Sequence, residues 1–221
     1  MTSSNASAWA DYQHGKSSLL ADLKPHDDNR FNRFFQVSEL IGIHASDAGT
    51  CVDLAGNGGL ASLIISKAHP KLRCLNTDYD ENAVDKSYTL LKEHPEFRVE
   101  SYLLNFMLPM DPDSASIFRS EIVLAMAVTH HLLLSQGHNL AGIFEKISAY
   151  SSKYVFIEFM PLGLWGGDLL NKSIVPDWYT TDWFESQFSR HYRLLEKKVI
   201  ESHLIAGVVE PHRVMFIGQL R

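Results

Sequence analysis

Short apolar runs alternate along this chain with longer segments in which apolar residues recur at helical spacing. Apolar runs bounded by turn residues are typical of buried strands, and apolar residues three or four positions apart are typical of one helix face. The pattern predicts strands over residues 50–55, 72–78, 97–106, 121–128, 153–160, 192–201 and 212–220. It predicts helices over residues 28–43, 59–70, 81–95, 140–152 and 181–192.

Local signals place the ends of these elements. Asp28 is the expected cap of the first helix and Gly42 its stop, and Thr181 or Asp182 is the expected cap of the last helix. The third strand leads into a loop over residues 109–112, which holds Pro109, Asp111 and Pro112.

Strands that alternate with helices form βαβ units around a mostly parallel sheet. The last two strands have no helix between them, so we expect them to pair antiparallel. The predicted fold is α/β: a doubly wound, Rossmann-like, mostly parallel seven-stranded sheet with an antiparallel C-terminal strand. A helical extension over residues 1–45 precedes the main domain, residues 46–221. A ligand of such a sheet binds at the carboxyl ends of its strands.

The small-residue turn after the first strand reads CVDLAGNGGLAS, residues 51–62. Residues 56–61 (GNGGLA) match the pattern G-x-G-x-x-A of dinucleotide sites, and Asp78 follows Asp53 by 25 residues. This favours an NAD(P)-binding oxidoreductase as one hypothesis. However, Asp53 stands directly before the turn, where its carboxylate would repel a pyrophosphate and would suit a ligand that carries an amino group.

The stretch Asp53 to Gly59 (DLAGNGG) resembles the first motif of the class I S-adenosylmethionine (SAM)-dependent methyltransferases, D-L-G-x-G-x-G. Ala55 and Asn57 replace two of that motif's glycines. Asn tolerates left-handed backbone geometry, and Ala55 is harmless here if its φ is negative. The segment LNTDYDENAV resembles the second motif, in which an acid at the position of Asp78 accepts from the ribose hydroxyls.

Other segments extend this resemblance. Asn105 stands where the family recognises the adenine amine, and LAMAVTHHLLL resembles its fourth strand and substrate entrance. The N-terminal aromatic residues are implied to close over the cofactor. The resemblance implies SAM contacts from Asp53, Ala55, Gly56, Asn57, Gly59, Asp78, Tyr79, Asn105, Phe106, Ala127, Trp9 and Tyr12.

A narrower resemblance, to a bacterial subgroup of methyltransferases described as nodulation-protein-like, runs from Trp9 to about Arg213. It is carried by AWADY, DLAGNGG, VTHHL, YVFIEFMP and PDWYTTDWFE. It implies O-methylation of a carbohydrate or natural-product acceptor.

A histidine pair follows the most continuously apolar strand. His131 is the preferred general base, because imidazole titrates near neutrality and can take a proton from a hydroxyl. His130 is expected to pack or to face the cofactor, and Glu158 is the next catalytic candidate. A structural pair of histidines, with Glu158 orienting one of them, is the alternative. Adjacent histidines chelate poorly, so no metal is expected there.

The loop after the fifth strand carries Trp165 among three glycines, and Trp178 follows it. It could form a mobile lid whose indole rings stack on an acceptor, or the rings could anchor the loop to the core.

Charge and composition narrow the partners. The net charge of −6 and the absence of a Lys/Arg cluster beyond residues 197–198 argue against nucleic acid. Cys51 and Cys74 are expected to be buried thiols, as in a cytoplasmic protein, and no apolar run is long enough to span a membrane. We expect a small-molecule or carbohydrate acceptor and a possible homodimer. A non-catalytic SAM-binding domain is the third hypothesis, and the altered glycines support it.

Overall fold

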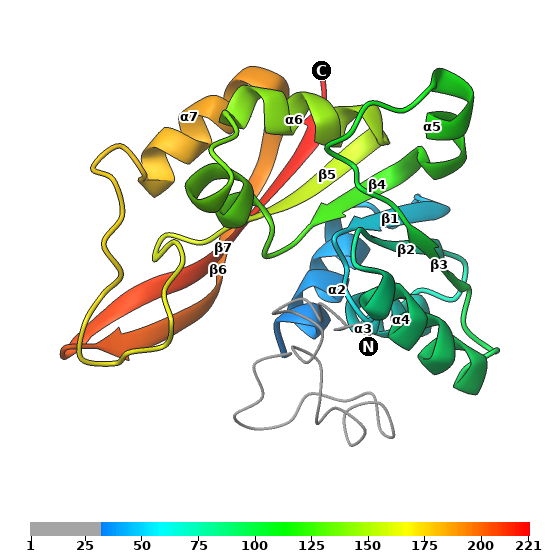
Figure 1. Ribbon diagram of the computed structural model, residues 1–221, viewed down its shortest axis with the longest axis horizontal. Coiled ribbons are helices and arrows are strands. Elements are labelled where there is room, and N and C mark those ends of the chain that lie inside the picture. Colours follow the sequence, from blue (N-terminus) through cyan, green and yellow to red (C-terminus); the bar gives the residue numbers. More distant parts are fainter. Residues whose placement is uncertain (1–31) are drawn as a thin grey trace, which may run out of the picture. The chain divides into compact units, whose positions relative to one another are not determined.

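The computed structural model describes residues 32–221 of the chain. Figure 1 shows its helices and strands. They are, in chain order, α2 (Asn32–His44), β1 (Thr50–Leu54), α3 (Leu60–Ala68), β2 (Arg73–Asp78), α4 (Glu81–Glu93), β3 (Val99–Leu103), α5 (Pro112–Phe118), β4 (Ser120–Ala125), the π-helix η1 (His131–Ser135), α6 (Leu140–Ala149), β5 (Ser151–Phe159), α7 (Thr181–His191), β6 (Tyr192–Ile205) and β7 (Val208–Leu220).

The strands form a seven-stranded sheet in the order β3-β2-β1-β4-β5-β7-β6. Hydrogen bonds pair β1 with β2, β2 with β3, and β4 with β5 in parallel. β7 runs antiparallel to both β5 and β6. The predicted α/β fold, with a mostly parallel sheet and an antiparallel C-terminal end, is therefore confirmed.

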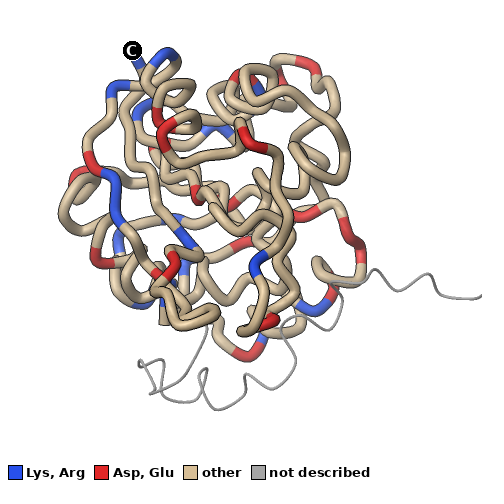
Figure 2. The backbone as a smooth tube through the Cα atoms, turned by 90° about the vertical axis from the view of Figure 1, so that its left-hand side faces the viewer, with Lys and Arg blue, Asp and Glu red and all other residues tan. Residues whose placement is uncertain are grey.

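Charged residues of both signs are interspersed along the described chain (Figure 2). Within residues 32–221, no helix combines the length and the apolar character that crossing a bilayer requires.

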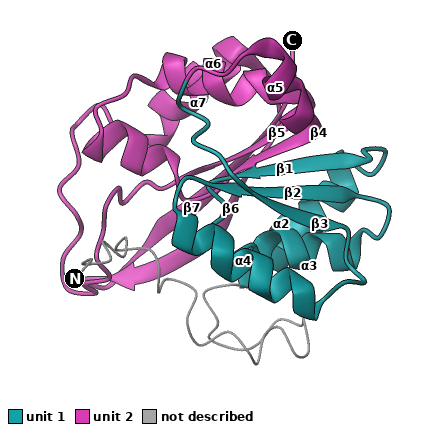
Figure 3. Cartoon of the chain, turned by 45° about the vertical axis from the view of Figure 1, so that its right-hand side comes forward, with its two compact units in different colours: residues 1–108 teal, residues 109–221 magenta. Residues whose placement is uncertain are grey.

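The first of two compact units ends at Leu108 (Figure 3). In it, α3 and α4 pack on β2 and β3, and α2 packs on α3. α3 buries seven of its nine residues, because both its neighbours and the sheet cover it. Cys51 and Cys74 lie opposite each other in β1 and β2 as buried free thiols, as predicted. Hydrogen bonding to Cys74 and burial raise the pKa of Cys51.

The second unit runs from Pro109 to Arg221. Its core is aromatic: the ring of Phe144 meets those of Phe184, Phe188 and Tyr192 edge to face. The Tyr192 hydroxyl donates to the Phe144 carbonyl at 2.9 Å, which satisfies it inside this core. The long β6–β7 hairpin turns at Ala206 and Gly207, both at positive φ.

Three local predictions are corrected, and one element was not predicted. α2 continues past Gly42 to His44, because a single glycine weakens a helix without ending it. Thr180, rather than Thr181 or Asp182, caps α7 by accepting from the Trp183 N–H. Residues 109–112, expected as loop, lead directly into α5, which Asp111 caps and Pro112 begins. The π-helix after His130 was not predicted.

Asp28 lies outside the described residues. The predicted extension over residues 1–45 is described only from Asn32 onward, so its boundary stays a prediction.

Candidate functional site

The turn between β1 and α3 has an unusual backbone. Ala55, Asn57 and Gly59 have φ values of 60°, 51° and 78°, so every second residue is left-handed. The expectation for Asn57 is met, because its short polar side chain tolerates this region. The condition set for Ala55 is not met: its φ is positive, which costs an alanine roughly 1–2 kcal/mol. The turn therefore holds strain at Ala55.

The Gly56 position shows why this turn approaches β1 and β2 so closely. A Cβ at Gly56 would lie 2.2 Å from Asn76 Oδ1 and 2.6 Å from Asp53 Oδ2. A Cβ at Gly59 would lie 2.6 Å from Ser87 Oγ. The chain's own polar side chains therefore require glycine at both positions, and the side chain of Asp53 lies against the backbone of the turn.

Asp78, at the end of β2, is bonded to the turn. Its Oδ2 accepts from the Asn57 N–H at 2.9 Å, and its Oδ1 accepts from the Asp80 N–H at 3.0 Å. Burial raises the pKa of Asp78, and these backbone hydrogen bonds oppose the rise. Each carboxylate oxygen has two acceptor sites, so the group retains capacity for hydroxyl donors.

Two buried polar residues of β2 complete this arrangement. Asn76 Nδ2 donates to the Asn57 carbonyl at 2.9 Å, and Thr77 Oγ1 donates to the Asp53 carbonyl at 2.9 Å. Sequence reasoning missed both. Two adjacent polar residues within an otherwise apolar strand were the signal in the sequence. Both are fully buried, and buried polar side chains need hydrogen-bond partners.

The next strand ends beside these groups. Asp78 pairs with Leu103 in the parallel register of β2 and β3, which brings Asn105 two residues beyond that level. Asn105 is exposed and its Oδ1 accepts from the Met107 N–H at 3.1 Å, whereas Phe106 is buried. Tyr79 is 56% exposed. The carboxyl ends of three parallel strands thus present the polar groups that the sequence predicted there.

The second unit holds the histidine pair, with ring centroids 4.0 Å apart. His130 is buried, and its pKa is lowered to about 2 by burial first and then by His131, Arg213 and His212. His131 is half-buried, and burial lowers its pKa too. Both imidazoles are therefore neutral at pH 7, and His131 is the more exposed of the two.

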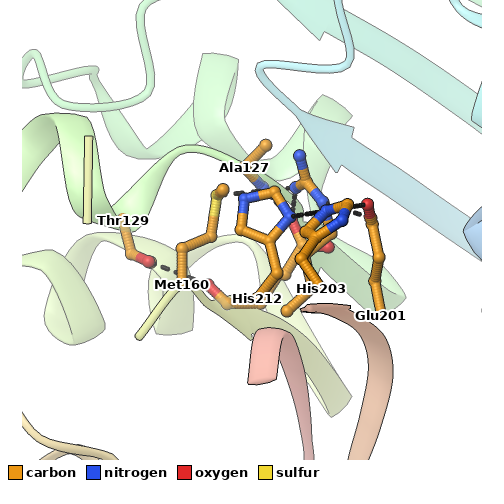
Figure 4. Close-up of polar contacts among 8 residues, drawn as sticks. Ala127, Thr129, Met160, Glu201, His203 and His212 are labelled. Carbon is orange, nitrogen blue, oxygen red and sulfur yellow. Dashed lines mark hydrogen bonds and ion pairs between the residues drawn. The ribbon is translucent and has the colours of Figure 1, made fainter. Parts of the chain in front are cut away.

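Glu158 is fully buried at the end of β5. Its Oε2 accepts from the Ala127 N–H at 2.7 Å and from Arg213 Nη1 at 2.9 Å, and its carbonyl accepts from Thr129 Oγ1 at 2.8 Å. Figure 4 shows Ala127 and Thr129 in this network. Glu158 thereby holds the segment before the histidine pair, where Ala127 has a φ of 52°. This geometry fits a positioning role better than proton transfer, and the sequence had not indicated Arg213.

Both loop tryptophans have partners within the second unit. Trp165 Nε1 donates to the carbonyls of Asp168 and Asn171 at 3.1 and 3.0 Å. The ring of Trp178 lies 4.7 Å from that of Trp183, centroid to centroid. Trp9 and Tyr12 lie outside the described residues.

No family model matches the sequence, and no curated protein matches it. Solved structures match the fold. The N-terminal domain of EvdMO1 with S-adenosylhomocysteine (SAH) bound matches with a TM-score of 0.59 at 11% identity, over 85% of this chain and 81% of that one. The same domain was crystallised in the presence of SAH and D-fucose.

Two further structures match over most of both chains. The PH0226 protein from Pyrococcus horikoshii OT3 has a TM-score of 0.65 at 13% identity, over 89% of this chain and 93% of that one. Magnesium protoporphyrin IX methyltransferase (ChlM) from Synechocystis PCC 6803, with bound SAM, has a TM-score of 0.58 at 8% identity, over 96% and 93%. This chain therefore has the Rossmann-like fold found in SAM-dependent methyltransferases.

Proposed function

We propose that this protein is a SAM-dependent methyltransferase whose cofactor binds at the strand ends of the first unit. The observation that carries the proposal is the left-handed turn packed on Asp53 and bonded to Asp78. Glycine at positions 56 and 59 keeps the turn's backbone close to β1 and β2. SAM carries both an amino group and a ribose diol, and two carboxylates at successive strand ends suit that pair of groups.

Each residue of this site has a proposed role. Asp53 attracts the amino group of the methionine moiety, and Asp78 accepts from the ribose hydroxyls. Asn105 contacts the adenine amine, with Tyr79 and Phe106 beside it. SAH and SAM bound in two of the matching structures support the choice of cofactor.

On the acceptor side, we propose a hydroxyl of a small molecule or carbohydrate. When bound, SAM supplies an electrophilic methyl group on a sulfonium. The chain's own contribution would be to orient the acceptor oxygen toward that methyl group and, through His131, to take the hydroxyl proton. His130, held neutral by burial, packs against His131 without adding charge. The D-fucose used with one matching structure supports this acceptor class.

An acceptor that is already a deprotonated oxyanion would not need His131 as a general base, and neither would an amine acceptor. The interspersed charges of Figure 2 favour a small molecule over a nucleic acid, since phosphate binding needs clustered cations.

The test begins with the cofactor. Isothermal titration calorimetry with SAH and with NAD⁺ should show binding of SAH and none of NAD⁺; the reverse result would contradict the proposal and favour the oxidoreductase hypothesis. Radiolabelled SAM is then incubated with the protein and an acceptor panel of sugars, phenols and amines. Label should pass to a hydroxyl compound. SAH binding without any labelled product in the panel or in a cell extract would support the non-catalytic hypothesis.

A further inference from the structure

Glu201, His203 and His212 form a cluster on the β6–β7 hairpin, and none of them has a role in the proposed methyl transfer. Glu201 and His203 are two positions apart on β6, so their side chains share one face of the strand. In the pairing with β7, Glu201 lies opposite Arg213 and Ser202 lies opposite Pro211, which leaves His212 as an extra residue. Such a bulge redirects a side chain, and here it brings His212 to the two β6 residues.

One side-chain atom from each residue of this cluster forms a corner of a small triangle. Figure 4 shows the three side chains. His203 Nε2 lies 2.9 Å from Glu201 Oε1 and 3.0 Å from His212 Nδ1, and His212 Nδ1 lies 3.4 Å from Glu201 Oε1. Ligand atoms about 2.1 Å from a common metal ion lie roughly 3.0–3.4 Å from one another, depending on the coordination angle. The triangle has the size of a metal's ligand set.

Hydrogen bonds join His212 Nδ1 to His203 Nε2 and to Glu201 Oε1, but hydrogens cannot fill all three edges of the triangle separately. Each ring nitrogen carries at most one hydrogen, so two hydrogens at most serve three edges. If both nitrogens are protonated, two N–H groups oppose each other across the 3.0 Å edge. A cation at the centre would meet one lone pair from each of the three atoms.

The surroundings orient these ligands. Arg213 Nε lies 2.8 Å from Glu201 Oε2, which leaves Oε1 directed at the histidines. The same guanidinium reaches Glu158 through Nη1. The Trp165 ring packs beside both histidines, with its centroid 5.1 Å from that of the His203 ring and 5.3 Å from that of the His212 ring. Partners of this kind, behind the direct ligands, hold side chains in coordinating positions.

We propose that Glu201 Oε1, His203 Nε2 and His212 Nδ1 bind a first-row divalent transition metal, and specifically Zn²⁺. Two imidazoles and one carboxylate suit Zn²⁺, whereas Mg²⁺ and Ca²⁺ prefer all-oxygen sites. Three protein ligands leave a coordination position for water or for an oxygen of a small molecule, as in catalytic zinc sites. His203 is 32% exposed in its side chain, so an ion can reach the cluster from solvent.

The test uses the full-length chain without a histidine tag, treated with a chelator and dialysed. Zn²⁺ is titrated in competition with a chromophoric chelator, and Co²⁺ absorption reports the geometry. We expect one equivalent of Zn²⁺ to bind, and His203→Ala and Glu201→Gln each to weaken it at least about 100-fold, since even outer partners matter 10- to 100-fold. His138→Ala, which removes an exposed histidine elsewhere in the same unit, should leave the affinity unchanged.

Circular dichroism and the thermal midpoint in chelator show whether each variant is folded, and Glu201→Gln preserves the side-chain shape. If the wild type does not bind Zn²⁺, or if folded His203→Ala and Glu201→Gln bind it as tightly as the wild type, the proposal is overturned. SAH affinity is measured on the same samples. The metal proposal does not depend on SAH binding, so each proposal can fail without the other.

Discussion

The carboxylate of Asp78 accepts a hydrogen bond from the backbone N–H of Asn57 at 2.9 Å, which joins the end of β2 to the turn after β1. One side chain thereby holds the turn and faces the region where the ribose of SAM is proposed to bind. Folding and cofactor binding consequently share this residue, and its substitutions should affect both.

Asp78→Ala should abolish measurable SAH binding and lower the free energy of unfolding by about 2 kcal/mol. The loss of stability follows because the N–H groups of Asn57 and Asp80 lose their acceptor. Calorimetry with SAH and urea denaturation measure the two effects. Asp111→Ala is the matched control: it removes another aspartate that accepts from a backbone N–H, at the exposed cap of α5, and should leave SAH affinity unchanged. Wild-type SAH affinity in Asp78→Ala would remove Asp78 from the proposed cofactor site.

Ala55→Gly should stabilise the protein, by up to about 1 kcal/mol. Glycine relieves the cost of a φ of 60°, although its greater freedom in the unfolded chain offsets part of the gain. Ala206→Gly is the control, since Ala206 has a φ of 48° in the β6–β7 hairpin. Both variants should gain stability in urea denaturation, and any change in SAH affinity should be confined to Ala55→Gly. Destabilisation of Ala55→Gly would contradict the left-handed backbone at this position.

His131→Ala should lower turnover by about 100- to 10,000-fold, the usual contribution of a general base, with SAH affinity unchanged. Because burial lowers the pKa of His131, the acid limb of the wild-type rate profile should lie below the ordinary histidine pKa of about 6.5. Steady-state kinetics across pH on an identified acceptor measure both effects, with His138→Ala as the control. Undiminished turnover in His131→Ala would exclude it as the base.

Acid should destabilise the fold through His130. Its pKa is about 2 when folded and about 6.5 when unfolded, so between these values the unfolded chain binds a proton that the folded chain does not. Its stabilising contribution is present above pH 6.5 and is lost as the pH falls toward 2, with a limiting slope of about 1.4 kcal/mol per pH unit.

His130→Gln removes this titration while retaining a polar side chain. Urea denaturation at pH 7 and pH 5 should therefore show a smaller difference in unfolding free energy for His130→Gln than for the wild type. Equal pH dependence of the two proteins would contradict the neutral, buried state of His130.

Arg213→Met should lower the unfolding free energy by about 3 kcal/mol or more, because the fully buried Glu158 loses its ion-pair partner. Adding Glu158→Gln should recover part of the loss, since the second change removes the uncompensated charge. A double-mutant cycle in urea measures this coupling. Additive effects of the two substitutions would show that the pair does not interact.

The placement of the candidate cofactor residues at the ends of successive strands could be derived from the sequence. Asp53, Asp78 and Asn105 each follow an apolar run, and the carboxyl ends of parallel strands lie at one edge of a sheet. The same periodicity predicted all seven strands. The short helix α5 was missed because a proline and an aspartate favour both turns and helix starts, and seven residues are too few to show a period.

The sequence by itself determined the fold class and the polar strand ends, because burial imposes a period on each strand and helix that is visible in one dimension. The tertiary structure alone decided the φ of Ala55, since a backbone angle depends on what the turn packs against. It also decided the pairing of Arg213 with Glu158 and the meeting of Glu201, His203 and His212. These contacts depend on the register of the hairpin and its bulge, which no local pattern in the sequence specifies.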